Sequence, residues 1–182
     1  MNSLGKEYLT TTIKRLKYYK GLGDKTFEQL DDRDFHFMPD PESNSIAIIV
    51  QHLAGNMLSR FTNFLSEDGE KEWRKRDDEF EIHDHSKTQI LEIWEKGWNC
   101  CFSSLGSLNE EDLLKTILIR NEQLSVIDAI NRQLAHYPYH IGQIVYIARM
   151  IKKESWVNLS IPKNQSQQYN SGSEVKDPAK EY

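Results

Sequence analysis

Two histidines that stand four residues apart are the residues of this sequence best suited to metal chemistry. The stretch from His136 to His140 reads His-Tyr-Pro-Tyr-His. In a helix this spacing puts both imidazoles on one face, about one turn apart, so that they can share one ion. The pair alone is a short motif, and short motifs also occur by chance.

A third histidine strengthens the pattern. His52 lies beside the apolar stripe of a second helical segment, as His136 and His140 lie beside the stripe of theirs. We therefore expect the three imidazoles to meet at one edge of a helical bundle and to hold one divalent metal ion. Three nitrogen ligands leave a fourth position for water or a substrate, as in catalytic zinc sites. The alternative is three partly buried histidines that hydrogen-bond to backbone or carboxylate groups.

Two amide side chains are expected near these histidines. Asn56 follows His52 by one helical turn, and Gln143 follows His140 by three residues. Both are candidates for hydrogen bonds to the ligands or to a substrate, and ordinary helix surface is the alternative for each. A general base is harder to find, because no His-Glu-x-x-His arrangement occurs beside the histidines. This favours a transfer reaction over hydrolysis, which usually needs such a base.

Pro138 lies between the paired histidines. A proline inside a helix removes one backbone hydrogen bond and clashes with the carbonyl four residues back, at a cost of roughly 3 kcal/mol unless the helix kinks. A kink would adjust how His136 and His140 approach an ion. Alternatively, the helix begins only after Pro138, which would separate the two side chains and weaken the metal hypothesis.

The periodicity of apolar residues predicts the helices that must position these side chains. Hydrophobic residues recur at helical spacing in four segments, and Gly21 and Gly23 break the first pattern. The helix starts are marked by residues that can cap free amides: Ser43 or Ser45 in the second helix and Ser125 in the fourth. We expect helices over residues 3–19, about 45–65, 86–105 and 125–150. Four helices with long connections indicate an all-α protein, a four-helix bundle.

A charged crossover joins the second and third helices. Residues 66–85 are too many for a plain turn in a compact domain, so the segment is a candidate for a functional loop. Trp73, Arg74 and Arg76 within it could form a lid or bind an anionic group. The alternative is a solvated loop that Trp73 alone anchors.

Two shorter features complete the organisation of the chain. Residues 114–126 are consistent with a short β-hairpin before the last helix. We assign residues 1–155 to the metal-binding bundle domain. Residues 156–182 are rich in Asn, Gln, Ser and Lys, which predicts an extended or disordered tail. Such a tail would pack, at most, through Leu159 and Ile161.

The two cysteines and the other three histidines are weaker candidates for a functional site. Cys100 and Cys101 are adjacent in the third helix, where neighbouring side chains point apart and do not reach disulfide geometry. Cys101 falls on the apolar stripe and is expected to be buried, like most free cysteines. The other histidines stand in polar connections, and we expect all of them to be exposed to solvent: His36, His83 and His85.

Charge and hydropathy exclude several classes of function. The 182 residues carry a formal net charge of −5, and their basic residues are scattered among acids, so nucleic acid is not an expected partner. The longest apolar run, residues 46–50, is far shorter than the roughly 20 residues that span a bilayer. The N-terminal residues lack the pattern of a secretion signal. We expect a cytoplasmic protein with a small-molecule substrate and no membrane association.

Three sequence stretches occur in a characteristic order. They are Gln-His-Leu-Ala-Gly-Asn at 51–56, the segment 68–80 from Asp-Gly-Glu to Glu-Phe, and His-Tyr-Pro-Tyr-His-Ile-Gly-Gln at 136–143. In this order and separation the chain resembles the DinB/YfiT-like superfamily of small bacterial metalloproteins, and within it a Bacillus-type subfamily of unknown function. The stretches together span most of the domain.

This resemblance implies an up-down-down-up four-helix bundle, frequently a homodimer. It also implies one divalent metal ion held by His52 from the second helix and by His136 and His140 from the fourth. Zinc or nickel is the first expectation, and iron, cobalt or manganese are the alternatives. Better understood members of the superfamily transfer low-molecular-weight thiols such as bacillithiol, or isomerise substrates with a thiol cofactor.

The leading functional hypothesis is therefore a metal-dependent enzyme, with thiol transfer as its reaction. A metal ion with an open position lowers the pKa of a bound water or thiol, so that a nucleophile exists near neutral pH. A metal-dependent hydrolase is one alternative. A non-enzymatic metal-binding or stress-response interaction module is another. A ferritin-like di-iron protein would require paired Glu-x-x-His segments, which do not occur in this sequence.

Overall fold

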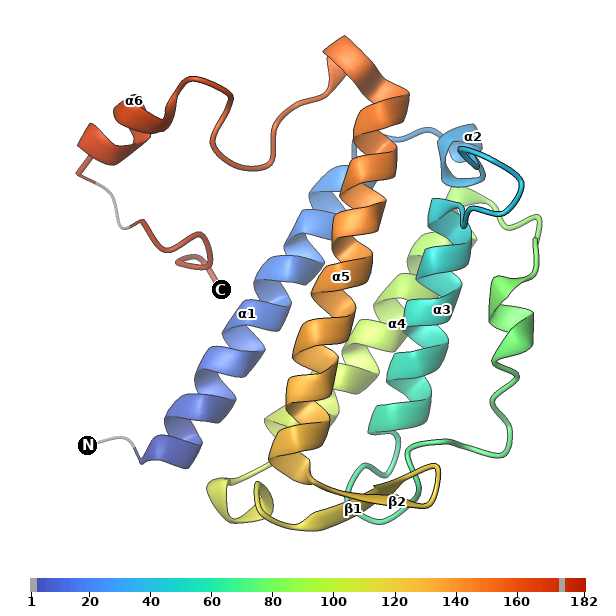
Figure 1. Cartoon of the computed structure of the whole chain (residues 1–182), viewed down its shortest axis with the longest axis vertical. Helices are drawn as coiled ribbons and strands as arrows, with labels where there is room; N and C mark the ends of the chain where they lie inside the picture. The colour runs from blue at the N-terminus through green and yellow to red at the C-terminus, as the bar shows by residue number, and fades with distance from the viewer. Residues whose placement is uncertain (1–2, 174–175) are drawn as a thin grey trace.

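The computed structural model describes residues 3–173 and 176–182 (Figure 1). The described chain is mostly helical, with six α-helices and one two-stranded antiparallel hairpin. Four long helices run alongside one another: α1 (Leu4–Phe27), α3 (Ile46–Phe61), α4 (Lys87–Gly106) and α5 (Val126–Lys152). The shorter elements are α2 (Asp32–Phe35), α6 (Ser166–Ser171), β1 (Thr116–Ile119), β2 (Glu122–Ser125) and the 3₁₀ turns η1 (Asp77–Phe80), η2 (Glu110–Asp112) and η3 (Lys153–Ser155). Among the described residues, no helix combines the length and apolar character needed to cross a membrane.

The first helix is longer than its sequence predicts. The two glycines suggest that it stops before Gly21, whereas α1 continues through both of them to Phe27. Gly23 lies against the ring of Trp94 from α4, where an added Cβ would come within 2.6 Å of a ring carbon. The prediction of a helix break at Gly21 and Gly23 was wrong, because contact with a neighbouring helix outweighs the low helix propensity of glycine.

Serine caps mark the starts of α3 and α4. The Ser45 hydroxyl accepts a hydrogen bond from the backbone N–H of Ile48 at 3.3 Å. Ser86 and Gln89 form a reciprocal capping box, in which the Gln89 side chain accepts the backbone N–H of Ser86 at 2.9 Å. Each cap satisfies amides that the first helical turn leaves without partners. The helix starts expected near these serines are confirmed.

The α3 helix ends earlier than predicted and approaches α4 closely. It stops at Phe61 rather than near Leu65, because Thr62 has an extended backbone and the next residue, Asn63, has a positive φ of 49°, outside the α-helical region. On the facing helix, an added Cβ at Gly97 would lie 2.8 Å from the Cα of Ala54. The two backbones therefore come together at a position that only glycine allows.

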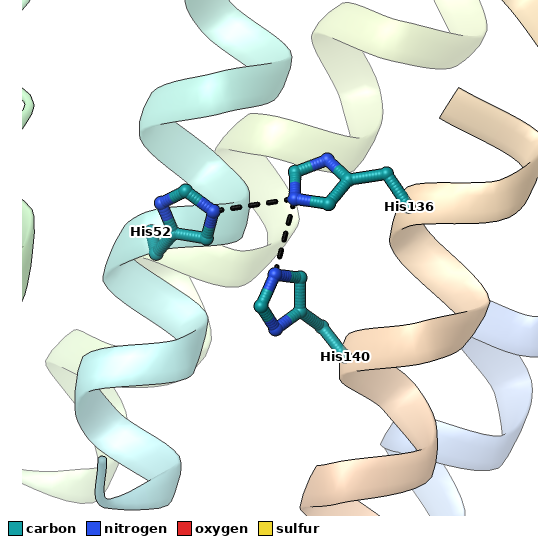
Figure 2. Close-up of side chains that lie close together, drawn as sticks. All are labelled: His52, His136 and His140. Atoms are coloured by element: carbon teal, nitrogen blue, oxygen red, sulfur yellow. Dashed lines mark hydrogen bonds between the residues drawn. The ribbon is translucent and has the colours of Figure 1, made fainter. Parts of the chain in front are cut away.

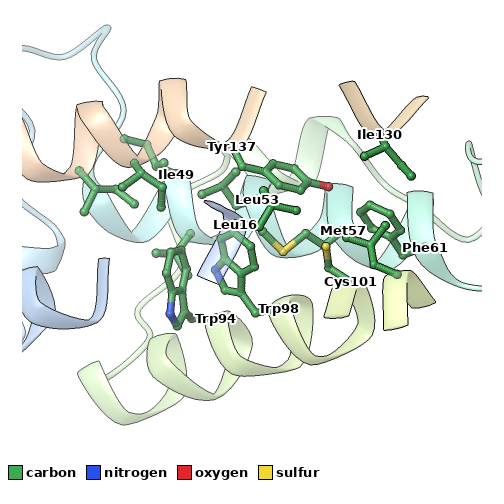
Figure 3. Packing of buried hydrophobic residues seen from close by; sticks show 14 of the residues in the cluster. Leu16, Ile49, Leu53, Met57, Phe61, Trp94, Trp98, Cys101, Ile130 and Tyr137 are labelled. Atoms are coloured by element: carbon green, nitrogen blue, oxygen red, sulfur yellow. The ribbon is translucent and has the colours of Figure 1, made fainter. Parts of the chain in front are cut away.

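The hydrophobic core lies between the four long helices (Figure 3). Its largest fully buried side chains are Trp94 and Trp98 from α4 and Tyr137 from α5. The two tryptophan rings meet edge to face with centroids 5.5 Å apart, and Trp98 meets Tyr137 in the same way at 5.7 Å. Such aromatic pairs add about 0.5–1.5 kcal/mol to the burial of their area. The contact between Trp98 and Tyr137 turns the Tyr137 face of α5 toward α4.

A short β-hairpin precedes α5 and confirms the predicted one. Ile119 of β1 pairs with Glu122 of β2, so Arg120 and Asn121 form a two-residue turn. Both turn residues have a positive φ, 57° and 62°, as a type I′ hairpin turn requires. Asp68 of the crossover accepts the backbone N–H groups of Arg120 at 2.8 Å and Asn121 at 2.7 Å. The crossover and the hairpin are thus held together.

The last long helix is continuous and contains Pro138. It begins at Val126, where the Ser125 hydroxyl accepts the backbone N–H of Asp128 at 3.3 Å. The alternative in which the helix starts only after Pro138 was wrong, because the cap and the core contacts of the first turns already hold it. His136 therefore lies on the same helix as its partner four residues later.

The described part of the tail contains α6 and contacts α1. The Asp177 carboxylate accepts from Lys14 at 2.6 Å and from Arg15 at 2.5 Å. The composition of this segment predicts packing, at most, through Leu159 and Ile161. Ile161 is 42% exposed, so apolar contact accounts for only part of the attachment. The ion pairs of Asp177 with Lys14 and Arg15 hold the tail to α1 as well.

Candidate metal centre

The three histidines selected by their spacing lie together between α3 and α5 (Figure 2). His52 belongs to α3, and His136 and His140 belong to α5. The Nε2 atom of His136 lies 3.3 Å from that of His52 and 3.0 Å from that of His140. One ligand atom from each histidine lies within 4.8 Å of the others. This cluster could hold one metal ion.

The outer nitrogen of each imidazole has an acceptor of its own. The Nδ1 atoms donate to side-chain oxygens as follows: His52 to Glu79 at 3.0 Å, His136 to Gln133 at 3.4 Å and His140 to Gln143 at 2.7 Å. A proton on Nδ1 leaves a lone pair on Nε2 of a neutral imidazole. Three lone pairs therefore face one another in the middle of the cluster.

Lone pairs that converge in this way could hold a cation between them. Two nitrogens at about 2.0–2.1 Å from a tetrahedral zinc ion are roughly 3.3 Å apart. The separations of 3.3 and 3.0 Å in the cluster are close to that value. Three imidazoles suit ions such as zinc, nickel or iron better than magnesium or calcium, which prefer oxygen. The residues thus fit one divalent ion with room for a further ligand.

Burial keeps two of these side chains neutral. Burial, followed by the neighbouring His140 and His52, lowers the pKa of His136 to about 3. Burial also lowers the pKa of His140, although its hydrogen bond with Gln143 acts in the opposite direction. A metal binds the unprotonated nitrogen, so protons do not compete with the ion for these ligands near neutral pH.

The spacing of the histidines does not reveal Glu79, which lies in η1 of the crossover. Its carboxylate accepts from His52 and is held by Arg74 through Nε to Oε1 at 2.7 Å and Nη2 to Oε2 at 2.9 Å. Burial raises the pKa of Glu79, but the bonds from His52 and Arg74 outweigh burial, and the net pKa is lowered. A carboxylate in this position orients a ligand imidazole and increases its basicity. The signals for it in the sequence were the unusual length of the crossover and the place of Glu79 in the stretch 68–80 that carries the family resemblance.

The surface of α3 leaves room for this carboxylate. An added Cβ at Gly55 would lie 2.2 Å from Oε1 of Glu79, so a larger residue would push the carboxylate away. Next to it, Phe80 covers His52 with ring centroids 4.8 Å apart. The crossover therefore covers the outer side of His52 and is more than a solvated connection.

An arginine rather than a tryptophan anchors this crossover. Trp73, the expected anchor, is 57% exposed. The side chain of Arg74 is only 1% exposed and pairs with Glu79 and, at 3.5 Å, with Glu70. A charge buried to this extent requires carboxylate partners, which fix the segment that carries them. The prediction that Trp73 alone anchors the loop was wrong.

The two predicted amides have different partners. Gln143 bonds directly to its ligand histidine, as the helical spacing indicates. Asn56 is buried and accepts from the hydroxyl of Tyr137 at 3.1 Å, so it joins α3 to α5 beside the cluster. Gln133 holds His136 and was not anticipated, although its distance of three residues on the same helix is a signal of the same kind.

The other histidines and the cysteines lie outside the cluster. His36 donates from Nε2 to the carbonyl oxygen of His85 at 2.8 Å, and the rings of His83 and His85 stack with centroids 5.4 Å apart. All three are half-buried, so the expectation of solvent exposure was wrong, because the connections that carry them pack on one another. Cys101 is buried as expected and Cys100 is half-buried, and both are free.

A comparison with known protein families identifies the family of the chain. Residues 3–165 match the model of a family described as "Protein of unknown function (DUF1572)". The chain belongs to this family. The DUF1572 match includes all three histidines and the crossover with Glu79, and it ends just before α6. No curated protein and no solved structure matches the chain.

A cavity of about 280 Å³ lies beside the histidines of this DUF1572 chain. Two of the three histidines and two amides form part of its lining: His52, His136, Asn56 and Gln133. All other lining residues are arginines: Arg60, Arg74, Arg76, Arg120 and Arg132. Every ionisable side chain that lines the cavity is thus a histidine or an arginine, and the cavity is basic.

Proposed function

We propose that the protein is a metal-dependent enzyme that transfers a low-molecular-weight thiol, of the bacillithiol type, to an electrophilic small molecule. The observation that carries the proposal is the convergence of three Nε2 atoms beside a cavity, with each Nδ1 held by an acceptor. A divalent ion bound there would supply a Lewis acid that lowers the pKa of a thiol at its open position. Three protein ligands are typical of catalytic zinc sites, whereas structural sites usually have four.

The proposed reaction is a substitution at carbon. The thiol sulfur forms a bond to the electrophilic carbon, the leaving group takes the electron pair of the bond that breaks, and the thiol proton passes to solvent. The residues of the chain orient the imidazoles through their Nδ1 acceptors and provide a cavity whose guanidinium groups favour the thiolate over the thiol. The reaction needs no further protein base.

This cavity favours thiol transfer over hydrolysis. A hydrolase usually needs a general base that can accept a proton from water. The carboxylate beside the cluster, Glu79, is already occupied by Arg74 and by the outer nitrogen of His52. Arginine does not give up its proton in proteins and cannot replace it. The lining therefore supports a reaction whose nucleophile is a thiolate.

The proposal extends to the fold and its assembly. We infer that the four long helices form an up-down-down-up four-helix bundle of the DinB/YfiT-like kind, supported by the resemblance of the stretches 51–56 and 136–143. The same resemblance supports a homodimer and a native zinc or nickel ion, with iron, cobalt or manganese as the alternatives, and the composition supports a cytoplasmic location. Analytical ultracentrifugation would test the dimer.

Metal analysis and a transfer assay test the function together. Purified wild-type protein should contain one ion per chain, His140→Ala should lose it, and His36→Ala, a half-buried histidine outside the cluster, should keep it. Metal-loaded protein should consume bacillithiol and a model electrophile faster than metal-free protein does. Equal metal content in wild type and His140→Ala would overturn the site. Bound metal without any transfer above the metal-free control would favour the non-enzymatic module.

A further inference from the structure

The cavity beside the histidine cluster holds more positive charge than nearby carboxylates neutralise. Five arginines line it. Among the described residues, the carboxylates that pair with them are Glu70, which contacts Arg60, Arg74 and Arg120, and Glu79, which contacts Arg74. Asp68 forms no ion pair with them, but its carboxylate interacts electrostatically with Arg60 and accepts the backbone N–H of Arg120. Five guanidinium groups against three carboxylates leave an excess of two positive charges, before any metal ion is added.

Two of these arginines have no carboxylate partner in the part of the chain that the structure describes. Arg76 lies over the ring of Phe80, with 5.1 Å from its guanidinium carbon to the ring centroid. Arg132 forms neither an ion pair nor a hydrogen bond with a described residue. It stands four residues before His136 on α5, so it shares a helix face with a metal ligand candidate. Both guanidinium groups are exposed and free to bind a ligand.

A third arginine in the lining is buried and only partly satisfied. Arg60 is 4% exposed, and its Nε has no hydrogen-bond partner. Its terminal nitrogens donate to the carboxylate of Glu70 and to the carbonyl oxygen of Gly69. A buried donor of a charged group without an acceptor is costly. An oxygen atom of a ligand in the cavity would be a suitable acceptor.

The hairpin turn holds a fourth arginine in an unfavourable conformation. Arg120 has a φ of 57°, a region that suits glycine and asparagine better than a long side chain. The backbone is kept there by Asp68, and the side chain bonds through Nε to Glu70 at 3.1 Å. Strained residues that neighbouring groups hold in place are frequent at binding sites. The turn therefore directs its charge to the wall of the cavity.

We propose that this arginine-lined cavity binds the anionic part of the substrate, a multiply charged oxyanion such as a phosphate or a dicarboxylate. Guanidinium groups pair with both through two parallel hydrogen bonds. An excess of two positive charges matches a dianion better than a neutral group. A volume of 280 Å³ equals that of about nine water molecules, which suits a small anion and not a polymer. The inference rests on the proposed function, because the metal site supplies the reacting end of the cavity.

Calorimetric titration of metal-free protein with inorganic phosphate and with succinate tests the anion site, since no metal is present to bind the probes. At least one probe should bind, with an affinity that falls as salt rises. Arg132→Gln and Arg76→Gln should each weaken binding about tenfold, or about 1.4 kcal/mol. Neither substitution removes an ion pair of the fold. Arg149→Gln is the matched control on α5, because Arg149 bonds to Asn158 and does not line the cavity.

The two probes distinguish the source of the anion. Tighter binding of phosphate assigns a phosphorylated substrate, and tighter binding of succinate assigns a carboxylate of the substrate or of the thiol itself. Absence of binding by both probes, or equal binding by wild type and the Arg76 and Arg132 variants, would overturn the inference.

Failure of this inference differs from failure of the proposed function. Anion binding with no thiol transfer would refute only the transfer. In an active enzyme, Arg132→Gln should raise KM about tenfold for an electrophile that carries a carboxylate, while kcat and the KM of its methyl ester change little. Transfer with equal KM in wild type and variant for the charged substrate would refute only the anion site.

Discussion

Replacing Glu79 with glutamine tests whether the charge of this side chain, rather than its size, supports the histidine cluster. Glutamine retains the size of glutamate but loses the charge that Arg74 neutralises and that strengthens the bond from His52. Loss of a group that orients a metal-ligating histidine costs about 10–100-fold in metal affinity. The amide oxygen can still accept one hydrogen bond, so we expect the lower part of this range, about 10-fold to 30-fold, or about 1.4–2 kcal/mol.

Competition with a chelating dye at neutral pH measures the zinc affinity, and urea unfolding of metal-free protein measures stability. Glu79→Gln should lower both, because Arg74 is 1% exposed and loses a carboxylate partner. Glu70→Gln is the matched control. Glu70 also pairs with Arg74, but its other bonds go to arginines and not to a histidine. It should reduce stability and leave zinc affinity unchanged.

Equal losses of zinc affinity in the two variants would refute the reasoning, because affinity would then follow global stability rather than the bond to His52. Unchanged affinity in Glu79→Gln would refute it as well. Gly55→Ala provides a second route that leaves the carboxylate itself intact. Its added Cβ would lie 2.2 Å from Oε1 of Glu79 and displace it, so zinc affinity should fall in the same direction.

Two further predictions concern helix contacts and acid stability. Gly97→Ala should lower the free energy of unfolding by about 1–3 kcal/mol, since its Cβ would lie 2.8 Å from Ala54. Gly142→Ala, which meets nothing within 4 Å, should raise it by about 1 kcal/mol, and urea unfolding compares them. Burial raises the pKa of Glu70, but Arg74 and other arginines outweigh burial and lower the net value below the ordinary 4.5. Glu70 thus stabilises the fold above pH 4.5, and wild-type stability should fall more steeply than that of Glu70→Gln as the pH drops below it.

The long helices were predictable because each buries one continuous apolar stripe, which periodicity detects locally. The same is true of His136 and His140, whose spacing places them on one helix face. The prediction failed where a residue far away in the sequence determines the local backbone structure. Gly23 can either break a helix or let an aromatic ring pack closely against it. Which of these occurs depends on Trp94, which lies 71 positions further along the chain. No local pattern contains that information.

The position of Glu79 beside His52 could not be predicted for a related reason. It belongs to a one-turn 3₁₀ segment without periodicity. Its place beside His52 is set by the ion pair with the buried Arg74 and by the space that Gly55 of α3 leaves for its carboxylate. The crossover is held in turn by Asp68, whose partners lie in the hairpin turn. An irregular segment takes its position from such tertiary bonds, so its length, its charge and the motif at 68–80 were visible in the sequence, but its place beside His52 was not.

The arginine cavity shows why net charge alone is a poor guide to binding. The net charge of −5 and the scattered basic residues in the sequence give no sign of a basic site. The cavity, however, combines Arg60 of α3, Arg74 and Arg76 of the crossover, Arg120 of the hairpin and Arg132 of α5. Residues spread over the sequence therefore create a positive field within about 8–10 Å, the screening distance at physiological salt. Small anions that fit the cavity would respond to this local field.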